Sequence, residues 1–379
     1  MEFELSETEK LIQQTAHDYA TRELEPGASE REAKGSFPFD KLAQMAGLGL
    51  MGVNVPEKWG GVEAGVLAYA LAMMEIARAC ASTAVTMAVT NMVAEIICKF
   101  GSVEQIGRHV PRLTSGEYVA GAFALSEPHC GSDATALKTS ARRTDDGWLL
   151  NGTKQFITSG SHAGVIVCWA RTGEQGARGI SAFLVPKDTP GLSAGPEEKK
   201  MGLMASNTVS LIFEDARLPP DALLGEENHG FPIAMVALDG GRIGVASQAV
   251  GIAQAALEQA VGYSQDRNAF GKPLSEHQAI QWMIADSATE LDAARLLVFR
   301  ASDLKSRQKP FTREAAMAKL FATEAANRIC ARSFQIHGGY GYIKDYPIER
   351  LVRDSRVTTI YEGTSEIQRL VIARSMLRS

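Results

Sequence analysis

Hydrophobic and polar positions along the chain follow three successive patterns. Up to about residue 118 the pattern is helical: Ser6–Glu9 opens an amphipathic segment, and Val66–Phe100 is rich in Ala, Met and Leu with few helix breakers. Short alternating or β-branched runs follow, separated by turn residues, and then the helical pattern returns to the end. We therefore predict an N-terminal helical domain (1–118), a middle antiparallel, β-barrel-like domain (119–226) and a C-terminal helical bundle (227–379).

Local signals place individual elements within this outline. Asp146-Gly147 and Asn151-Gly152 are dipeptides that favour tight hairpin turns. The strands predicted around and after them are Gln155–Thr158, Val165–Trp169, Ser181–Val185 and Thr208–Phe213. In the C-terminal part, after a long helix carrying Ile243 and Leu257 on one face, helices are predicted over Gln278–Lys305, Thr312–Ile336 and Thr364–Leu377. Their apolar residues are expected to form the core of a bundle.

Composition narrows the class of protein. The 379 residues are 45% hydrophobic and 22% charged, as in an ordinary globular protein of more than one domain. The net charge of −5 disfavours nucleic-acid binding, which needs a basic surface. Five scattered cysteines without a CxxC pair favour a reducing compartment.

Nothing in the sequence predicts a membrane protein. The N-terminus, Met1–Glu7, is acidic and lacks the basic and apolar regions of a signal peptide. We expect no apolar run long enough to span a bilayer. The expected location is the cytoplasm, or the mitochondrial matrix if the source is eukaryotic.

A glycine motif at Gly47-Leu48-Gly49-Leu50-Met51-Gly52 matches the GxGxxG pattern of dinucleotide-binding loops. That pattern carries meaning only after a strand and before a helix. Here the glycines follow a helical pattern and lead into Val53-Asn54-Val55-Pro56. We therefore interpret them as a helix end and a loop, and not as a Rossmann fingerprint.

A single acidic residue near the C-terminus, Glu362, lies on a predicted turn before the last helix. Gly363 permits backbone angles that a side chain would hinder, and Ser365 and Gln368 fit a capping box. Ile367, Leu370 and Val371 would then form one apolar face of the helix. From this pattern alone, an acid that merely stabilises the helix start is the more common explanation.

The run Ile360-Tyr361-Glu362-Gly363-Thr364-Ser365-Glu366-Ile367-Gln368-Arg369 resembles the C-terminal signature of the acyl-CoA dehydrogenases. The resemblance extends over essentially the whole chain. It implies an α+β fold with an N-terminal helical domain, a middle antiparallel β domain and a C-terminal four-helix bundle. It also implies that Glu362 is the base that removes an α-proton from an acyl-CoA thioester.

Two segments of the middle domain are similar to flavin-contacting parts of that family. In Phe123–Asp133, the resemblance assigns FAD contacts to Phe123, Leu125, Ser126, Gly131 and Ser132, with Ser132 also reaching the substrate. His129 and Cys130 depart from the family pattern, which leaves the loop shape open. No further His or Cys has ligand spacing, so we predict no metal site. In Gln155–Thr158, the corresponding contacts fall on Phe156, Ile157 and Thr158.

Without the resemblance, each of these segments has a plainer explanation. A Pro- and Gly-containing loop is most often a surface turn. An aromatic residue beside β-branched ones is more often part of the core than a cofactor contact.

The C-terminal domain carries two further motifs. In Leu238–Arg242, the resemblance implies that Asp239 and Arg242 contact the acyl-CoA, together with Tyr361 and Gly363 near the base. Isovaleryl-type members place their catalytic glutamate at the position of Gly241, which cannot act as a base, so Glu362 keeps that role. The Asp-Gly-Gly-Arg form is most similar to the short-chain, butyryl-type members.

The remaining implied FAD contacts are with a cofactor shared between neighbouring subunits. A guanidinium suits a diphosphate because its paired donors match phosphate oxygens, although a single arginine is more often a solvated helix residue. These contacts are assigned to Arg267, Phe270, Gln278, Gln335, Gly338, Gly339, Thr364 and Glu366. We assign no chemistry to His337.

The resemblance thus implies FAD-dependent α,β-dehydrogenation of an acyl-CoA to a trans-2-enoyl-CoA, with the hydride passing to flavin N5. It also implies a homotetramer and, as the electron acceptor, electron-transferring flavoprotein. A side chain cannot accept a hydride, so a redox cofactor is required. Two alternatives stay open: an oxidase of the same fold, and a non-catalytic acyl-CoA-binding scaffold. The acyl chain is expected to be short or medium and straight, with branched, alicyclic or dicarboxylic groups open.

Overall fold

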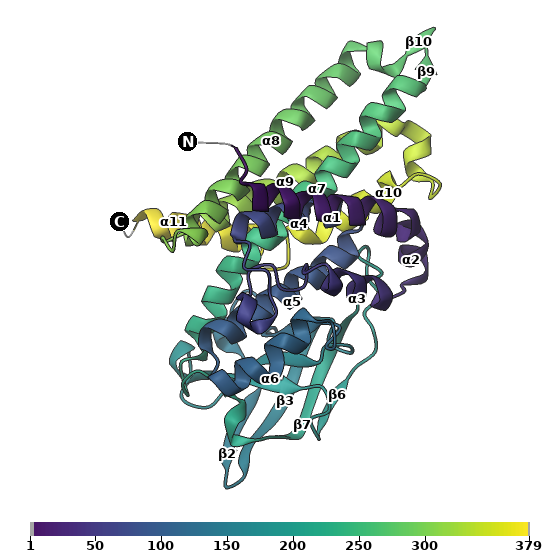
Figure 1. The fold of residues 1–379 in the computed structure, drawn as a ribbon. Helices are drawn as coiled ribbons and strands as arrows, with labels where there is room; N and C mark the ends of the chain where they lie inside the picture. The colour runs from purple at the N-terminus through teal and green to yellow at the C-terminus, as the bar shows by residue number, and fades with distance from the viewer. Residues whose placement is uncertain (1–3, 378–379) are drawn as a thin grey trace.

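The computed structural model describes residues 4–377 and confirms the succession of helical, β and helical parts (Figure 1). Met1–Phe3, part of the acidic N-terminal stretch, lie outside the described residues. The amphipathic segment predicted to open at Ser6–Glu9 is the first helix, which Ser6 caps by forming a capping box with Glu9. The N-terminal helices are α1 (Glu7–Tyr19), α2 (Ala28–Lys34), α3 (Phe39–Gly47), α4 (Val66–Ala79), α5 (Ala81–Phe100) and α6 (Val103–Thr114).

Helix α5 corrects one expectation. By length and composition, Ala81–Phe100 is apolar enough to cross a membrane, which the sequence reading did not anticipate. Its apolar window is 83% buried inside the protein, where α5 packs on α4, α6, α7 and β1. The apolarity of α5 is therefore that of a core helix.

The GxGxxG motif is confirmed as a helix end. Gly47 is the last residue of α3, and Gly49 has a φ of +76° in the loop that follows. No strand precedes these glycines in the described part of the chain, so the context of a dinucleotide fingerprint is absent.

The middle part is one eight-stranded sheet in the order β6-β7-β3-β2-β4-β5-β8, with β1 pairing with β4. Most pairs are antiparallel, as predicted, but β1 runs parallel to β4, and β2 meets β4 in one parallel bridge. All four predicted strand runs lie in strands. The strands are β1 (Gly121–Ala124), β2 (Ser140–Thr144), β3 (Gly147–Thr158), β4 (Val165–Arg171), β5 (Ile180–Pro186), β6 (Leu192–Ala194), β7 (Thr208–Leu218) and β8 (Leu223–Leu224).

One of the two predicted hairpin turns is wrong. Thr144 pairs with Gly147, so the chain does reverse at the first site, through the two residues between them. Asn151-Gly152 instead lies inside β3, at a register shift opposite β7. A Cβ on Gly152 would come within 2.7 Å of the Thr139 Cα, so this glycine serves a β-bulge against a neighbouring backbone.

The C-terminal part is built on α7, a helix of 37 residues that runs from the sheet to a projecting arm (Figure 1). Helices α8 and α9 pack along it, and the arm ends in a small hairpin of β9 (Asn268–Ala269) and β10 (Lys272–Pro273). The predicted helices are confirmed to within a residue or two, whereas α10 was not anticipated. The helices are α7 (Gly230–Asp266), α8 (Gln278–Ser306), α9 (Thr312–His337), α10 (Ile348–Thr358) and α11 (Ser365–Leu377).

The proposed domain divisions fall in connecting segments, between α6 and β1 and between β8 and α7, and stay predictions. Across them, one buried carboxylate joins three parts of the molecule. Glu32 on α2 accepts hydrogen bonds from the backbone N–H of Met204, at 3.0 Å, and from the Ser82 hydroxyl on α5, at 3.2 Å. Arg353 on α10 donates to the same carboxylate at 3.3 Å. This junction fixes the segment before β7 against both helical parts.

Removing the Glu32 carboxylate should lower the stability of the protein. Glu32→Ala leaves the Met204 N–H without its buried acceptor and removes one of the carboxylates that pair with Arg353, which keeps Glu349. We expect a loss of about 3 kcal/mol in the free energy of unfolding. Urea unfolding followed by circular dichroism measures it. Glu30→Ala is the matched control, because Glu30 lies on the same helix and only pairs with Lys34 at the surface; equal losses in the two variants would contradict the role of Glu32.

Candidate active site

Glu362 lies on the turn between α10 and α11, in a backbone conformation that few residues adopt. Its φ is +54°, and that of Gly363 is +88°. A non-glycine residue in the left-handed region is held there at a cost of about 1–2 kcal/mol. The turn is therefore a strained connection that the surrounding structure has to hold in place.

The predicted capping box is wrong by one residue. Thr364, and not Ser365, accepts the hydrogen bond of the Ile367 N–H, while the Ser365 hydroxyl is buried without a partner. The Gln368 side chain does not reach back to a cap; its Nε2 donates to the carbonyls of Glu362 and Gly363 at 3.1 and 2.8 Å. The expected apolar face of α11 is also only partly covered, since Leu370 is exposed. The helix is therefore capped one residue earlier than predicted, and the Gln368 side chain bonds to the carbonyls of the turn instead of the cap.

The Glu362 carboxylate points inward. Its Oε2 is buried and has no hydrogen-bond partner within the described chain. A Cβ placed on Gly241 of α7 would lie 2.7 Å from this oxygen and 3.1 Å from the sulfur of Met92 on α5. The missing side chain at Gly241 is thus what leaves room for the carboxylate.

Burial raises the pKa of Glu362 to about 7, and the positive charges of Arg242 and Lys319 hold it from rising further. A carboxylate with a pKa near neutral pH can accept a proton efficiently and still be ionised in a useful fraction of molecules. An unpartnered, inward-facing oxygen with such a pKa is the arrangement expected of a general base.

The other residues assigned to the acyl-CoA lie around this carboxylate. Arg242 is buried one helical turn from Asp239, and the two form an ion pair of 2.5 Å. Burial raises the pKa of Asp239 and lowers that of Arg242. The Tyr361 hydroxyl donates to Gln248 of α7, which anchors the turn to that helix. Glu366, at the start of α11, is exposed.

The two predicted flavin segments of the middle domain lie side by side. The Gln155 N–H donates to the Ser126 carbonyl at 2.9 Å, and Lys154 donates to the Leu125 carbonyl at 3.1 Å. Leu125 and the partly buried Phe123 share a hydrophobic cluster with Met92, which packs next to Gly241. These contacts bring the loop and β3 toward the same end of α7 as Glu362.

Of the residues in these two segments, Phe156 has the most unusual backbone conformation and exposure. It has a φ of +59° and its side chain is 66% exposed, whereas Ile157 beside it is buried and Thr158 is partly buried. Gly131 and Ser132 on the neighbouring loop are also exposed. An apolar ring that stands clear of its own sheet, beside a hydroxyl and a glycine loop, fits a surface for a planar ring system such as a flavin.

A buried ion pair underlies this surface. Lys154 Nζ lies 2.7 Å from Glu127, whose carboxylate also accepts the N–H groups of Lys138 and Thr139 at 2.7 and 2.9 Å. Glu127, His129 and Cys130 bring three potential metal-ligand atoms within 4.8 Å of one another, a proximity that the spacing of His and Cys did not predict. Because the Glu127 oxygens are already bonded and an ammonium lies against them, these residues do not favour a cation.

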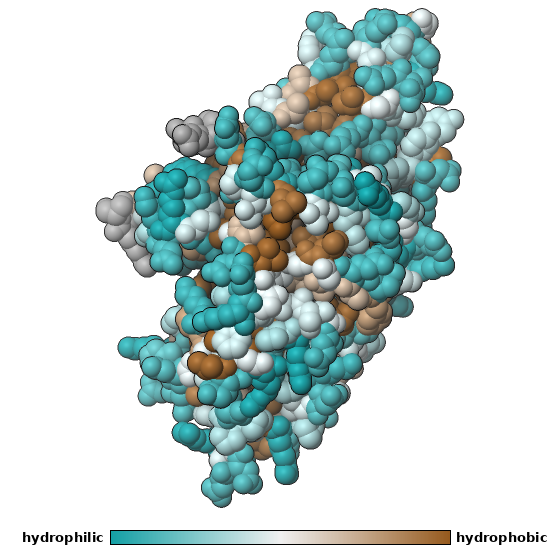
Figure 2. Space-filling view, viewed as in Figure 1, coloured by the Kyte–Doolittle hydropathy of each residue, from teal (hydrophilic) through white to brown (hydrophobic). Residues whose placement is uncertain are grey.

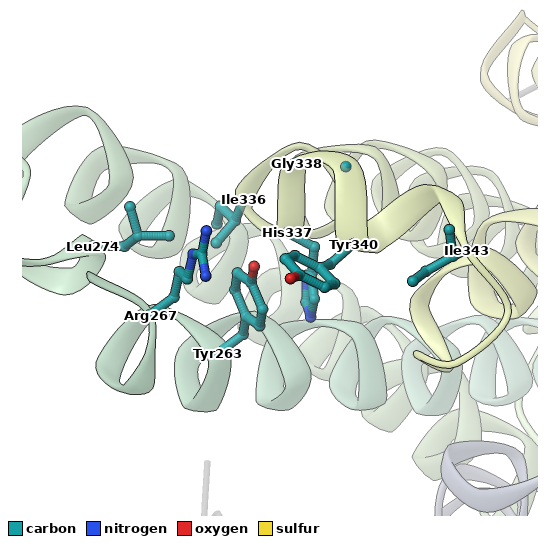
Figure 3. Close-up of a pocket in the computed structure, with 9 residues that line it drawn as sticks. Tyr263, Arg267, Leu274, Ile336, His337, Gly338, Tyr340 and Ile343 are labelled. Carbon is teal, nitrogen blue, oxygen red and sulfur yellow. The ribbon is translucent and has the colours of Figure 1, made fainter. Parts of the chain in front are cut away.

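The residues assigned to the phosphates and adenosine gather at the opposite end of α7. Arg267, Gly338 and Gly339 line one open pocket of about 420 Å³, together with Tyr263 and Tyr340 (Figure 3). Figure 3 shows Arg267 and Tyr263 extending from α7 toward the turn that carries Tyr340. The Arg267 guanidinium lies 5.4 Å from the centre of the Tyr340 ring.

This pocket has the donors and the space that a nucleotide needs. A Cβ on Gly338 or Gly339 would meet no atom within 4 Å, so a ligand can approach this backbone closely. Phe270, at the tip of the hairpin, is 97% exposed with a φ of +51°, and Gln278 and Gln335 are exposed nearby on α8 and α9. The residues at the two ends of α7 therefore each suit one part of a dinucleotide.

Three features of the site escaped the sequence reading. Lys319 on α9 is fully buried and donates to the Gly363 carbonyl at 2.8 Å. A lone lysine among Ala315, Ala318 and Ala322 was the available signal. The Glu127–Lys154 pair had none, because its residues lie 27 positions apart, and no local pattern marked Gln368 as a donor to the turn carbonyls five and six positions before it.

Comparison with known proteins agrees with this arrangement. The chain matches the models for the acyl-CoA dehydrogenase N-terminal domain (residues 6–117), middle domain (122–216) and C-terminal domain (228–377). It is 53% identical to the short-chain specific acyl-CoA dehydrogenase, mitochondrial, of Bos taurus over 99% of this chain and 92% of that protein.

Solved structures are similar over the full length. Butyryl-CoA dehydrogenase from Megasphaera elsdenii superposes with a TM-score of 0.98 at 42% identity, covering 100% of both chains. A chain from the structural work on the electron transferring flavoprotein of Acidaminococcus fermentans gives a TM-score of 0.99 at 43% identity, again covering 100% of both. With all three domains matched and the expected geometry around Glu362, the chain belongs to the acyl-CoA dehydrogenase family of enzymes.

Proposed function

We propose that this protein removes the α-proton and β-hydrogen of a short-chain acyl-CoA to give a trans-2-enoyl-CoA, with Glu362 as the base. One observation carries the proposal: a buried carboxylate oxygen without a partner, at a pKa of about 7, faces the space left by Gly241. The family membership and the names of the relatives support the same reaction.

The chain's own groups would act as follows. The ionised Glu362 carboxylate accepts the α-proton of the thioester. The developing enolate needs hydrogen-bond donors at the thioester oxygen. Within the described residues the Glu362 backbone N–H donates to no acceptor of the chain, so it is available for this task. Arg242, Asp239 and Tyr361, with Gly363 and Ser132, would position the acyl-CoA.

FAD is the cofactor that these residues fit, and when bound it supplies the acceptor for the β-hydrogen. Phe156, Ile157 and Thr158 would contact its ring system, together with the loop carrying Phe123, Leu125, Ser126, Gly131 and Ser132. Thr364 and Glu366, at the start of α11, would add further contacts to FAD near Glu362. The pocket at Arg267, Gly338 and Gly339, with Phe270, Gln278 and Gln335 around it, would hold phosphates and adenosine.

The spacing along α7 supports an assembly of several subunits. Gly241, next to the carboxylate, and Arg267, in the far pocket, are 26 positions apart on or next to one helix. At 1.5 Å per residue this is about 39 Å, which is more than one FAD molecule can reach. The far pocket of one subunit would therefore serve the flavin of a neighbour.

Exposed apolar side chains support the same conclusion. Trp282 and Leu296 on α8 and Phe270 on the hairpin are exposed large hydrophobic residues of the arm. Figure 2 shows apolar surface between the long helices toward the hairpin and again near the middle of this face. A homotetramer is the assembly that we propose.

Electron-transferring flavoprotein is our proposed oxidant, and the similar chain from work on such a flavoprotein supports it. An acyl-CoA oxidase of this fold would keep every residue discussed above. Peroxide release during turnover in air separates the two, since only the oxidase produces it at the rate of acyl-CoA consumption. A non-catalytic scaffold is disfavoured by the buried, unpartnered base.

Substrate length and location are the finer parts of the proposal. A short, straight acyl chain is favoured by the names of the bovine and Megasphaera relatives. A panel of acyl-CoA thioesters, compared by the rate of flavin bleaching, tests the preferred chain length.

All five cysteines are free, which suits a reducing compartment. The cytoplasm, or the mitochondrial matrix of a eukaryote, is the proposed location.

Glu362→Gln tests the base directly. The variant should retain FAD and bind butyryl-CoA, because the amide keeps the shape of the side chain, but it should not bleach the flavin under anaerobic mixing. Stopped-flow absorbance measures this. Glu57→Gln, an exposed change far from the turn in sequence, is the control; full bleaching by Glu362→Gln would overturn the assignment.

The pH dependence of kcat/KM reports the free enzyme. Glu362 acts in its ionised form and burial raises its pKa to about 7, so kcat/KM should be low at pH 5.5 and rise with pH through a midpoint near 7. Initial rates with a dye acceptor between pH 5.5 and 8 measure the curve. A profile that is flat across this range would contradict a base with this pKa.

Arg267→Ala tests the far pocket. Loss of a charge-assisted contact to a phosphate is worth about 1.5–3 kcal/mol, so FAD affinity should fall by at least about tenfold. Flavin content after dialysis against graded FAD concentrations measures it. Arg307→Ala changes an exposed arginine that, among the described residues, forms an ion pair with Asp303 alone, and this variant should retain its flavin.

A further inference from the structure

The carbonyl of Gly363 is the point at which the catalytic turn is attached to the bundle. It accepts hydrogen bonds from Lys319 Nζ on α9 and from Gln368 Nε2 on α11, each at 2.8 Å. Gln368 also donates to the Glu362 carbonyl at 3.1 Å. Two residues with left-handed φ angles are thereby held by donors from two different helices.

Lys319 is unusual among the lysines of the described chain. Its side chain is fully buried, and it forms no ion pair with a carboxylate within 4.0 Å in that part of the molecule. Burying an ammonium without a paired carboxylate is costly, so such a group is kept where its charge or its donors have a use. Within residues 4–377 its ammonium donates one hydrogen bond, to the carbonyl of Gly363, the residue that follows Glu362.

Resting on the function proposed above, we infer that Lys319 is a positioning residue: it holds the Glu362 turn through the Gly363 carbonyl, and its positive charge favours the ionised form of the base. Gln368 shares the first task with Lys319. Only Lys319 performs the second, because an amide carries no charge.

The charges that face these two groups are few. Glu362 is influenced by Arg242 on α7 and by Lys319. Lys319 is influenced by Glu362, by Arg242, and by Glu324 and Glu366 on α9 and α11. Burial lowers the pKa of Lys319 to about 8, so the ammonium is still the major form at pH 7.

Arg242 differs from Lys319 in one respect. It is already paired with Asp239 at 2.5 Å, so part of its field is cancelled near Glu362. Lys319 has no such partner. Of the two cations, Arg242 lowers the pKa of Glu362 the more, and the unpaired charge of Lys319 adds to that effect.

The test compares Lys319→Met with Gln368→Met, two variants that each remove one donor from the same carbonyl. The pKa of Glu362 is read by infrared spectroscopy of the FAD-loaded, substrate-free protein, from the protonated-carboxyl band that Glu362→Gln lacks. Removing a nearby cation disfavours the carboxylate, so the titration midpoint of Lys319→Met should move upward from that of the parent. The midpoint of Gln368→Met should stay in place.

Flavin bleaching by butyryl-CoA gives the second reading. For Lys319→Met the rate at pH 6.5 should fall about tenfold and recover toward the parent rate as the pH rises. For Gln368→Met any loss should be the same at every pH. Lys319→Arg should restore the midpoint, and Lys319→Gln should restore the hydrogen bond but not the midpoint; these two keep the test decisive if Lys319→Met does not fold.

An unshifted infrared midpoint in Lys319→Met or Lys319→Gln would overturn the inference. The infrared titration needs no acyl-CoA. If the parent protein fails to bleach with every acyl-CoA while the midpoint still moves, the proposed function is wrong and the charge effect of Lys319 stands by itself.

Discussion

A carboxylate that is taken out of water favours its protonated form, and neighbouring cations draw it back toward ionisation. The active end of this molecule depends on that balance at Glu362. Burial alone would leave a neutral acid at physiological pH, and a close, fully paired cation would leave a weak base. Here Arg242 is engaged with Asp239, and Lys319 bonds to a backbone carbonyl, so neither forms a direct ion pair with Glu362. The result is a pKa of about 7.

The backbone around Glu362 is part of the same balance. Its left-handed φ directs the side chain inward, toward the space left by Gly241 and the sulfur of Met92. That conformation is unfavourable for a glutamate in isolation. It persists because Lys319, Gln368 and Tyr361 attach the turn to three helices. The position of the Glu362 carboxylate and its protonation are thus controlled by overlapping sets of residues, and Lys319 belongs to both.

Helix α7 gives the molecule its second constraint. It carries Gly241 and Arg242 near one end and Tyr263 near the other, next to Arg267, and a helix is too stiff to bring these ends together. Residues that suit two parts of a dinucleotide therefore lie too far apart for one chain to hold the whole cofactor. This geometry relates the proposed catalytic site to the proposed assembly, in which the arm of a neighbouring subunit would complete the site.

Much of this fold could be predicted from the sequence because it depends on local patterns. Hydrophobic periodicity predicted the three-part order and most helices, and the run around Glu362 singled out the residue that we propose as the base. Local reasoning failed where a distant group decided the outcome. Asn151-Gly152 has the signature of a turn, but Thr139 lies against it and makes it a bulge. Ser365 has the signature of a cap, but the strained turn places Thr364 there instead.

The sequence by itself determined which residue types are available: the acid, the glycines beside it, the arginines and the exposed aromatic rings. Only the tertiary structure decided that Lys319 bonds to the turn after Glu362, that Glu127 and Lys154 form a buried pair, and that Glu32 joins three parts of the molecule. The physical reason is common to all three. Burial of a charge, and the backbone groups that compensate it, depend on segments far apart in the chain, and no local pattern records them.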